Sequence, residues 1–192
     1  MRVSKADLAA HRDAILKAAG RLFRERGVAG AGVAEVMREA GLTHGGFYGH
    51  YGSKSELAGA ACRAALAEGA ARWRRRAARA RAEGRDPVAA IADSYLTEEH
   101  LRRPEQGCAL PALAAEAARS GPPLETALAQ GTRELLGVLV DETGSEAAAL
   151  GVLAALVGGV VVARACADPE LAARTLAAAR NVALAARDLP KD

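Results

Sequence analysis

Apolar residues recur at helical spacing along most of the chain, and glycine, proline and capping residues separate one such stretch from the next. In the first stretch, the positions i, i+3, i+4, i+7 and i+8 are Ile15, Ala18, Ala19, Leu22 and Phe23. This spacing places five apolar side chains on one face of an α-helix. Gly27 follows, and a glycine is a common helix end. A chain built from such units folds by packing helices against one another.

The composition favours the same fold class. Hydrophobic residues make up 51% of the chain, which is enough for a buried core, and aromatic residues only 3%. Alanine, the strongest helix former, is very frequent. The residues that strands prefer are too sparse to supply many strands. We therefore expect an all-α protein with a mostly aliphatic core that is packed through small residues.

Start and stop signals divide the chain into about nine predicted helices and no convincing strand. Asp86-Pro87 and Asp168-Pro169 each combine an N-cap with proline at the first helical position. The segment from Ser53 to Glu56 has the pattern of a capping box. The predicted helices cover, approximately, residues 10–26, 33–40, 44–50, 54–81, 87–100, 108–120, 123–142, 146–166 and 169–188.

Charge, cysteine content and hydropathy favour a cytoplasmic protein. A balance of 26 Lys and Arg against 23 Asp and Glu is too mild to indicate a nucleic-acid binder by itself. Three widely spaced cysteines do not form a disulfide framework. Residues 2–26 lack the apolar core of a signal peptide. The uncharged segment 147–163 is slightly short for a membrane span and is predicted to be a fully buried helix, so we expect no membrane partner.

Two of the predicted helices, 33–40 and 44–50, are short and joined by a tight turn that contains Gly41. This is the form of a helix-turn-helix, whose second helix enters the major groove of DNA. Phe47 and Tyr51 are four residues apart and should both face inward, whereas Tyr48 should point another way. The sequence therefore predicts a DNA-reading helix at residues 44–50.

Three glycines, Gly45, Gly46 and Gly49, lie within this one short helix. Each costs about 0.5 to 1 kcal/mol relative to alanine in a helix, and local inconsistencies of this kind tend to mark functional sites. Glycine also lets a backbone approach a ligand surface closely, and the floor of a DNA groove is such a surface. The alternative is a loop with a glycine turn.

The run from Ile15 to Leu57 resembles the DNA-binding domain of the TetR/AcrR family of bacterial transcriptional regulators. The matching pieces are ILKAA at 15–19, LF at 22–23, RG at 26–27, AGLT at 40–43, GGFY at 45–48, HY at 50–51 and SKSEL at 53–57. The resemblance implies an all-α homodimer. Residues 1–55 would form a three-helix helix-turn-helix domain, and residues 56–192 a larger domain for effector binding and dimerisation.

The resemblance also implies a function. The protein would be a transcriptional regulator, most often a repressor, that binds a palindromic operator in double-stranded DNA as a dimer. A small-molecule effector would release it from the operator.

Several residues receive an implied role in DNA binding from their positions. The implied contacts to base edges are Thr43, His44, Gly45 and Gly46. The implied contacts to phosphates are Tyr48, His50 and Lys54. The sequence departs from the family at Gly32, which can cap a helix but lacks the hydroxyl group that usually touches a phosphate there.

The last two predicted helices carry stripes of apolar and small residues that suit a contact between two subunits. The first helix contributes Leu150, Leu153, Val157 and Val160, and three glycines beside them permit close approach of a partner helix. The last helix contributes Ala172, Leu176, Ala179 and Ala183. Burial of these stripes within one subunit is the alternative.

Three distinctive side chains, Tyr95, His100 and Cys108, fall in the region expected to line an effector pocket. Ordinary packing is the alternative for each of them. Because aromatic residues are scarce there, we expect a small or aliphatic ligand rather than a large stacked one.

Cys108 also suggests a different switch. It follows a glycine at a predicted helix start, near Arg102 and Arg103, and both features favour the reactive thiolate. The alternative function is therefore a thiol-based sensor of oxidants or electrophiles. Cys62 and Cys166 lie in Ala-rich helices and are expected to be buried and inert.

Other chemistry finds no support in the sequence. No dinucleotide fingerprint, nucleophile elbow or metal-ligand spacing is present, so we expect no cofactor, no metal and no enzyme activity. An enzyme that uses the helical cavity remains the least favoured alternative. An arginine-rich stretch in the fourth predicted helix, residues 72–81, is interpreted as a solvated helix face.

Overall fold

The structure is a computed structural model that describes residues 5–189, and this part of the chain is entirely helical with no strand. The all-α prediction is confirmed. The helices are α1 (Lys5–Gly30), α2 (Val33–Glu39), the 3₁₀ helix η1 (His44–Gly49), α3 (Lys54–Ala82), α4 (Pro87–Tyr95), α5 (Glu98–Arg102), the 3₁₀ helix η2 (Pro104–Gln106), α6 (Ala109–Ser120), α7 (Leu124–Thr143), α8 (Glu146–Ala165) and α9 (Pro169–Arg187).

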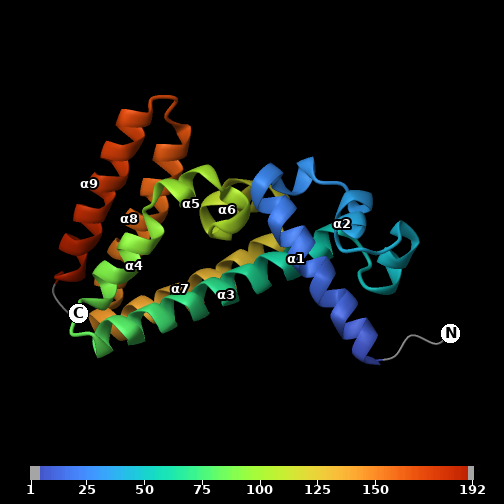
Figure 1. Cartoon of the computed structure of the whole chain (residues 1–192), viewed down its shortest axis with the longest axis horizontal. Coiled ribbons are helices and arrows are strands. Elements are labelled where there is room, and N and C mark those ends of the chain that lie inside the picture. The colour runs from blue at the N-terminus through green and yellow to red at the C-terminus, as the bar shows by residue number, and fades with distance from the viewer. Residues whose placement is uncertain (1–4, 190–192) are drawn as a thin grey trace.

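The small helices α2 and η1 project from one end of the molecule, next to α1, and the antiparallel pair α8 and α9 forms the other end (Figure 1). The long helices α3 and α7 lie side by side and connect the two ends. The expected domain boundary between residues 55 and 56 falls in the first turn of α3. No linker therefore separates the two ends. The expected domain termini at residues 1–4 and 190–192 lie outside the described residues.

The contact between α3 and α7 depends on small residues. A Cβ atom at Gly131 of α7 would lie 2.3 Å from Cδ1 of Leu66 on α3. A Cβ atom at Gly59 of α3 would lie 2.9 Å from Cβ of Pro123. These two glycines permit the close approach of the helices, which buries Leu66 and Leu135 between them.

Three helix predictions differ from the structure. The helix predicted over 87–100 is interrupted at Leu96, whose backbone is not helical, because Thr97 caps α5 through its side chain. The predicted helix 44–50 is a 3₁₀ helix. The first helix begins five residues earlier than expected and continues to Gly30 across a break at Gly27, where φ is +75°.

One described helix, Glu146–Ala165, is long and apolar enough to cross a membrane. It packs against α7 and α9, as a core helix does. The prediction that it is fully buried is wrong, because only 44% of its most apolar window is buried. Leu150 and Val161 on its outer face are exposed.

The apolar stripes predicted for a subunit contact lie mainly inside the chain. Leu153, Val160, Leu176, Ala172 and Ala183 are buried where α8 packs against α9. The cause is close approach within one chain, since a Cβ atom at Gly159 would lie 2.4 Å from Cβ of Ala179. Of the other predicted interface residues, Leu150 is exposed, and Val157 and Ala179 are half-buried.

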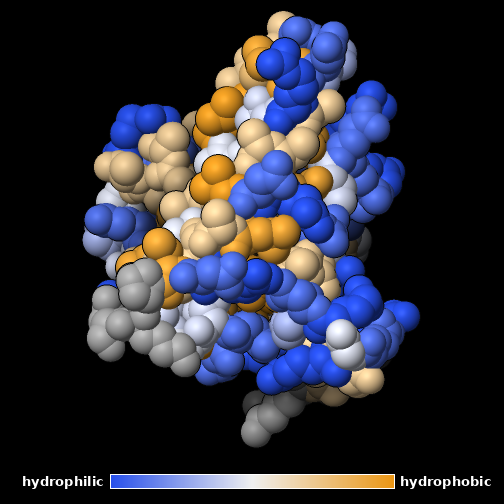
Figure 2. Space-filling view, turned by 90° about the vertical axis from the view of Figure 1, so that its left-hand side faces the viewer, coloured by the Kyte–Doolittle hydropathy of each residue, from blue (hydrophilic) through white to orange (hydrophobic). Residues whose placement is uncertain are grey.

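The outer face of the α8–α9 pair is apolar too. Of the eight exposed large hydrophobic residues in the described chain, six lie on or directly after these two helices: Leu150, Val161, Val162, Leu171, Val182 and Leu189. Figure 2 shows orange and tan residues gathered on this side of the molecule, between rows of blue ones.

Candidate DNA-reading surface and effector pocket

The turn between α2 and η1 is tight and requires glycine. Gly41 has φ +73°, a left-handed conformation that other residues rarely adopt. The backbone N–H of Leu42 donates to the carbonyl of Met37 at 2.9 Å and closes the turn. Val36 and Met37 are fully buried beneath it. The turn therefore fixes the orientation of η1 relative to α2.

Aromatic residues anchor η1 from below. Phe47 is 1% exposed and Tyr51 2% exposed, and their rings are stacked with centroids 6.2 Å apart. Tyr48, between them in sequence, is 73% exposed. The predicted directions of all three side chains are confirmed. A large aromatic side chain held in solvent on a well-anchored helix is free to contact another molecule.

The surface around Tyr48 contains the other residues with an implied role in DNA binding. Thr43, His44, Gly45, Gly46 and Gly32 are exposed, and His50 and Lys54 are half-buried. Thr43 occupies the N-cap position of η1, but its side chain makes no capping hydrogen bond. Its exposed hydroxyl is therefore not used in capping.

The fold itself does not demand the glycines of η1. A Cβ atom at Gly45 or Gly49 would meet nothing within 4 Å, and neither residue has a positive φ. A Cβ atom at Gly46 would make only ordinary contacts of 3.7 Å or more. Packing within the described chain therefore does not explain these glycines.

The predicted residues Ser53 and Glu56 cap the start of α3, although Glu56 binds the N–H of Gly52 and not that of Ser53. Ser53 accepts a hydrogen bond from the backbone N–H of Glu56, and the Glu56 carboxylate accepts one from Gly52 at 2.8 Å. Lys54, in the first turn, donates to the carbonyl of Ala29 at 3.4 Å. The ammonium group of Lys54 is thereby held near the segment that joins α1 to α2.

Two contacts tie this end of the molecule to the rest. The Glu116 carboxylate on α6 accepts hydrogen bonds from the backbone N–H groups of Val28, at 2.8 Å, and Ala29, at 2.9 Å. These donors lie directly after the break in α1 at Gly27. The guanidinium of Arg24 donates twice to the carbonyl of Glu105 in η2. Burial lowers the pKa of Arg24.

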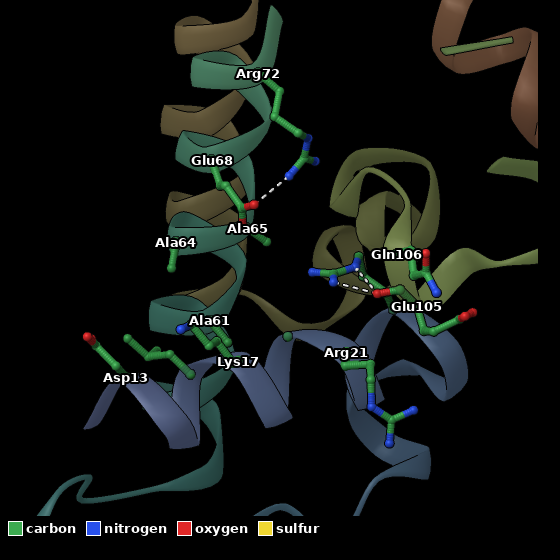
Figure 3. A pocket seen from close by; sticks show the side chains of 13 residues that line it. Asp13, Lys17, Arg21, Ala61, Ala64, Ala65, Glu68, Arg72, Glu105 and Gln106 are labelled. Atoms are coloured by element: carbon green, nitrogen blue, oxygen red, sulfur yellow. Dashed lines mark hydrogen bonds and ion pairs between the residues drawn. The ribbon is translucent and has the colours of Figure 1, made fainter. Parts of the chain in front are cut away.

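The Arg24 contact borders an open groove of about 660 Å³ between α1, α3 and η2. Figure 3 shows the paired bonds converging on Glu105, with Arg72 and Glu68 on neighbouring turns of α3 at the other side of the groove. Arg72 and Glu68 form an ion pair at 2.8 Å. Charged side chains of both signs line the groove, so it has no single ligand preference.

A second pocket brings together Tyr95, His100 and Cys108, the three residues proposed from the sequence to bind an effector. It has a volume of about 280 Å³ and lies between α3, α5 and η2. Trp73 packs edge-on against Tyr95 with ring centroids 5.5 Å apart, and Tyr95 packs edge-on against His100 at 4.5 Å. The sequence-based grouping therefore describes one real cavity, which we call the aromatic pocket.

His100 holds the wall of the aromatic pocket in place. Its Nδ1 donates to the carbonyl of Tyr95 at 2.7 Å, and its Nε2 accepts from the backbone N–H of Cys108 at 3.0 Å. This pattern requires the neutral ring. Burial lowers the pKa of His100, and nearby Arg164 and Arg72 lower it further. Gly107 must be glycine, because a Cβ atom there would lie 2.5 Å from the His100 ring.

The reactive-thiolate prediction for Cys108 is wrong. Its sulfur accepts a hydrogen bond from the Leu110 N–H at 3.4 Å, but burial raises the pKa of the thiol. Burial also raises the pKa of Cys62, to about 12. Cys166, expected to be buried, is half-exposed at the end of α8. The two expected activating arginines pair with carboxylates instead: Arg102 with Glu98 and Arg103 with Glu99.

Sequence reasoning missed several residues at these sites. Arg72, Trp73 and Arg76 line the aromatic pocket, although the arginine stretch was interpreted as a solvated face. Arg72 and Arg76 share a helix face because they are four residues apart, but this spacing does not indicate which element the face lies against. Glu116 had no signal in the sequence, because it lies 87 positions from the Ala29 N–H that it accepts from.

Comparison with known proteins agrees with this arrangement. Residues 15–61 match the family model for bacterial regulatory proteins of the tetR family. The whole fold is similar to E. coli NemR in its reduced form, with a TM-score of 0.73 and 20% identity over 90% of this chain and 97% of NemR.

Two further solved structures are similar. SCO4454, a TetR-family transcriptional regulator from Streptomyces coelicolor, has a TM-score of 0.67 and 22% identity over 94% of this chain and 97% of its own. A protein solved to explain the control of antibiotic production by bacterial hormones has a TM-score of 0.63 and 25% identity over 91% of this chain and 96% of its own. No curated protein sequence matches this chain.

Proposed function

We propose that the chain is an effector-responsive repressor of the TetR family of bacterial transcriptional regulators, on the premise that its residues 15–61 match the family model. It binds a palindromic operator as a dimer and releases it when a small molecule enters the aromatic pocket. The observation that carries this proposal is the exposed Tyr48 on an η1 helix whose other aromatic residues are buried.

DNA is held by two kinds of contact. Phosphate contacts position a protein on the duplex, and base contacts give it sequence specificity. Tyr48, His50 and Lys54 bind phosphates, while Thr43 and His44 reach base edges. Gly45 and Gly46 allow the backbone of η1 to approach the groove floor, since they present no side chain that would separate the two surfaces.

Dimerisation uses the outer face of α8 and α9. The inner stripe is already buried within the chain, so the contact falls to exposed residues such as Leu150, Val161 and Val182. An exposed apolar patch of this kind on a soluble protein marks an interaction site. A dimer presents two η1 helices to half-sites about 34 Å apart, which is one turn of DNA.

Effector binding in the aromatic pocket is coupled to the position of α1 through α6. Cys108, at the pocket wall, is the N-cap of α6, and Glu116 on the same helix accepts hydrogen bonds from backbone N–H groups in the last residues of α1. An effector that prefers one position of α6 therefore favours one position of the helix-turn-helix. This is a population shift, whose size is set by the difference in effector affinity between the two states.

Regulators of this family are generally not enzymes, and we propose no catalytic activity for this chain. A thiol switch at Cys108 is disfavoured as well, since burial raises the pKa of its thiol and the thiolate is the reactive form.

Substitution of the proposed phosphate contacts tests the DNA-binding role. Tyr48→Ala and Lys54→Ala should each weaken binding to operator and to nonspecific DNA alike, measured by fluorescence anisotropy. Lys54→Ala should also reduce the salt dependence of binding, because one fewer counterion is released. Lys17→Ala is the matched control, since Lys17 lines the groove at α1 and α3. If both test variants bind like Lys17→Ala with an unchanged salt slope, η1 does not read DNA.

A further inference from the structure

One wall of the aromatic pocket is rich in arginine. Arg72 and Arg76 lie one turn apart on α3, and Arg103 closes the end of α5. The single carboxylate in the lining, Glu99, pairs with Arg103 at 3.5 Å. The pocket therefore carries an excess of positive charge before any ligand enters.

The excess continues outside the pocket. Arg72 and Arg76 also line an adjoining pocket of about 520 Å³, together with Arg75, Arg79 and Arg85. The only carboxylate in its lining, Asp93, pairs with Arg180 of α9 at 2.5 Å. The two pockets together form a positively charged cleft, and a cleft of this kind raises the local concentration of anions.

Most of these arginines already have a partner. Arg72 pairs with Glu68 at 2.8 Å, Arg79 with Glu83 at 2.7 Å, and Arg85 with the same Glu83. Within residues 5–189, Arg75 and Arg76 form no ion pair with a carboxylate. Only Arg76 of these two lines the aromatic pocket itself.

A second polar group in the pocket lacks a partner. Tyr95 is only 5% exposed, and its hydroxyl is fully buried without a hydrogen bond. Burial, together with the neighbouring Cys108 thiol, raises the pKa of Tyr95 well above its ordinary value. A buried hydroxyl without a partner is unfavourable, so this donor is available to an acceptor atom of a ligand.

We propose that the aromatic pocket binds a small organic carboxylate, with the carboxylate on Arg76 and the Tyr95 hydroxyl and the apolar part against Trp73 and Leu135. The proposal rests on the effector role of this pocket and adds the chemical class of the ligand. A planar guanidinium matches a carboxylate with two parallel hydrogen bonds. A volume of about 280 Å³ is at the lower end of the range of small-molecule sites, which favours a compact acid.

Binding can be measured without DNA, because the only tryptophan of the chain, Trp73, lies in the pocket. Benzoate and hexanoate should each change its fluorescence in a saturable way at constant ionic strength. Benzamide and hexylamine, which keep the apolar parts but not the negative charge, should bind at least about tenfold more weakly, as expected for loss of a charge-assisted hydrogen bond.

Two variants test the proposed contacts. Arg76→Gln should weaken benzoate binding by about tenfold or more and leave benzamide binding unchanged. Arg74→Gln, which removes the same charge from an exposed position of α3 outside the lining, should bind benzoate like the wild type. Tyr95→Phe should weaken benzoate binding without lowering the melting temperature, because the hydroxyl makes no hydrogen bond in the free protein.

Equal binding of benzoate and benzamide would overturn the proposal, as would equal losses for Arg76→Gln and Arg74→Gln. If Tyr95→Phe lowers the melting temperature while benzoate binding is kept, the hydroxyl has a structural role and not the proposed one. The effector role is tested separately by adding benzoate to the DNA complex. Saturable, Arg76-dependent binding that leaves the DNA complex intact would support the anion site and contradict the proposed switch.

Discussion

At the scale of single residues, His100 shows how one neutral side chain joins distant parts of the sequence. It donates to the carbonyl of Tyr95 and accepts from the N–H of Cys108, so it fixes both walls of the aromatic pocket. The bond that Nε2 accepts from Cys108 requires the uncharged ring, because both ring nitrogens are donors once the ring is protonated. The position of the pocket walls therefore depends on the protonation of His100.

Because burial lowers the pKa of His100 in the folded protein, stability should fall on mild acidification. Above the ordinary value of 6.5 the ring is neutral in both states. As the pH falls below 6.5, the unfolded chain binds a proton that the folded chain does not, and the free energy of unfolding decreases. The decrease ends once the pH is below the lowered pKa.

Urea denaturation at about pH 7.5 and about pH 5.5 measures this effect. His100→Gln keeps one donor and one acceptor but does not titrate, so its loss of stability on acidification should be smaller than that of the wild type. His44→Gln, at an exposed position, is the control and should behave like the wild type. Parallel losses in all three proteins would contradict the account.

Cysteine reactivity provides a second test at this scale. Burial raises the pKa of both Cys62 and Cys108, whereas Cys166 lies at the end of α8 between two exposed alanines. With iodoacetamide at neutral pH, Cys166 should be labelled first and Cys62 last, as mapped by peptide mass. DNA binding should survive labelling of Cys166. Fastest labelling of Cys108, with release of DNA, would restore the thiol-sensor hypothesis.

At the scale of helices, start and stop signals are local, and the sequence therefore predicted most elements. Ser53, Asp86 and Asp168 all cap helices through their side chains as expected. The break at Leu96 was missed because no glycine or proline marks it. Thr97 was the available signal, but an isolated threonine within an apolar pattern is weak.

Helix packing was harder to predict than helix position. The stripes on α8 and α9 were predicted to form a subunit contact, but most of these side chains are buried within the chain, because periodicity does not say which surface covers a stripe. The two helices cover each other, because Gly151 and Gly159 allow close approach. Similarly, the aromatic pocket could be anticipated from unusual residues, while its arginine wall required knowledge of where α3 lies.

Two glycines of α7 provide a matched test of helix packing. A Cβ atom at Gly131 would overlap Leu66, whereas one at Gly137 would meet nothing within 4 Å. Gly131→Ala should therefore destabilise the protein by about 1 to 3 kcal/mol through overpacking. Gly137→Ala should stabilise it by about 0.5 to 1 kcal/mol through helix propensity. Equal effects in thermal denaturation would show that α3 and α7 do not pack as described.

At the scale of the whole molecule, the two ends have different surfaces. The η1 end exposes Tyr48 and small polar residues, and the α8–α9 end exposes an apolar face. In the proposed dimer the apolar face is covered and two η1 helices point toward one DNA duplex. Assembly and DNA binding are thus predicted to use opposite ends of the chain.

Light scattering of a charged variant tests the assembly. Val161→Arg places a charge on the exposed face of α8, where a partner subunit would leave it buried and unpaired. The variant should be a folded monomer that binds DNA more weakly. Ala78→Arg, at an exposed position of α3, should remain a dimer. A dimeric Val161→Arg protein would exclude this face as the interface.

The most direct test of the central claim is selection of bound sequences from a random pool of double-stranded DNA. The wild-type protein should enrich a palindrome whose half-sites are about 34 Å apart, the length of one DNA turn. Thr43→Ala should relax the preference within each half-site, because the proposed contact is to a base edge. If no palindrome is enriched, or if Thr43→Ala selects the same sequence with the same stringency, the account of η1 as the DNA-reading helix is wrong.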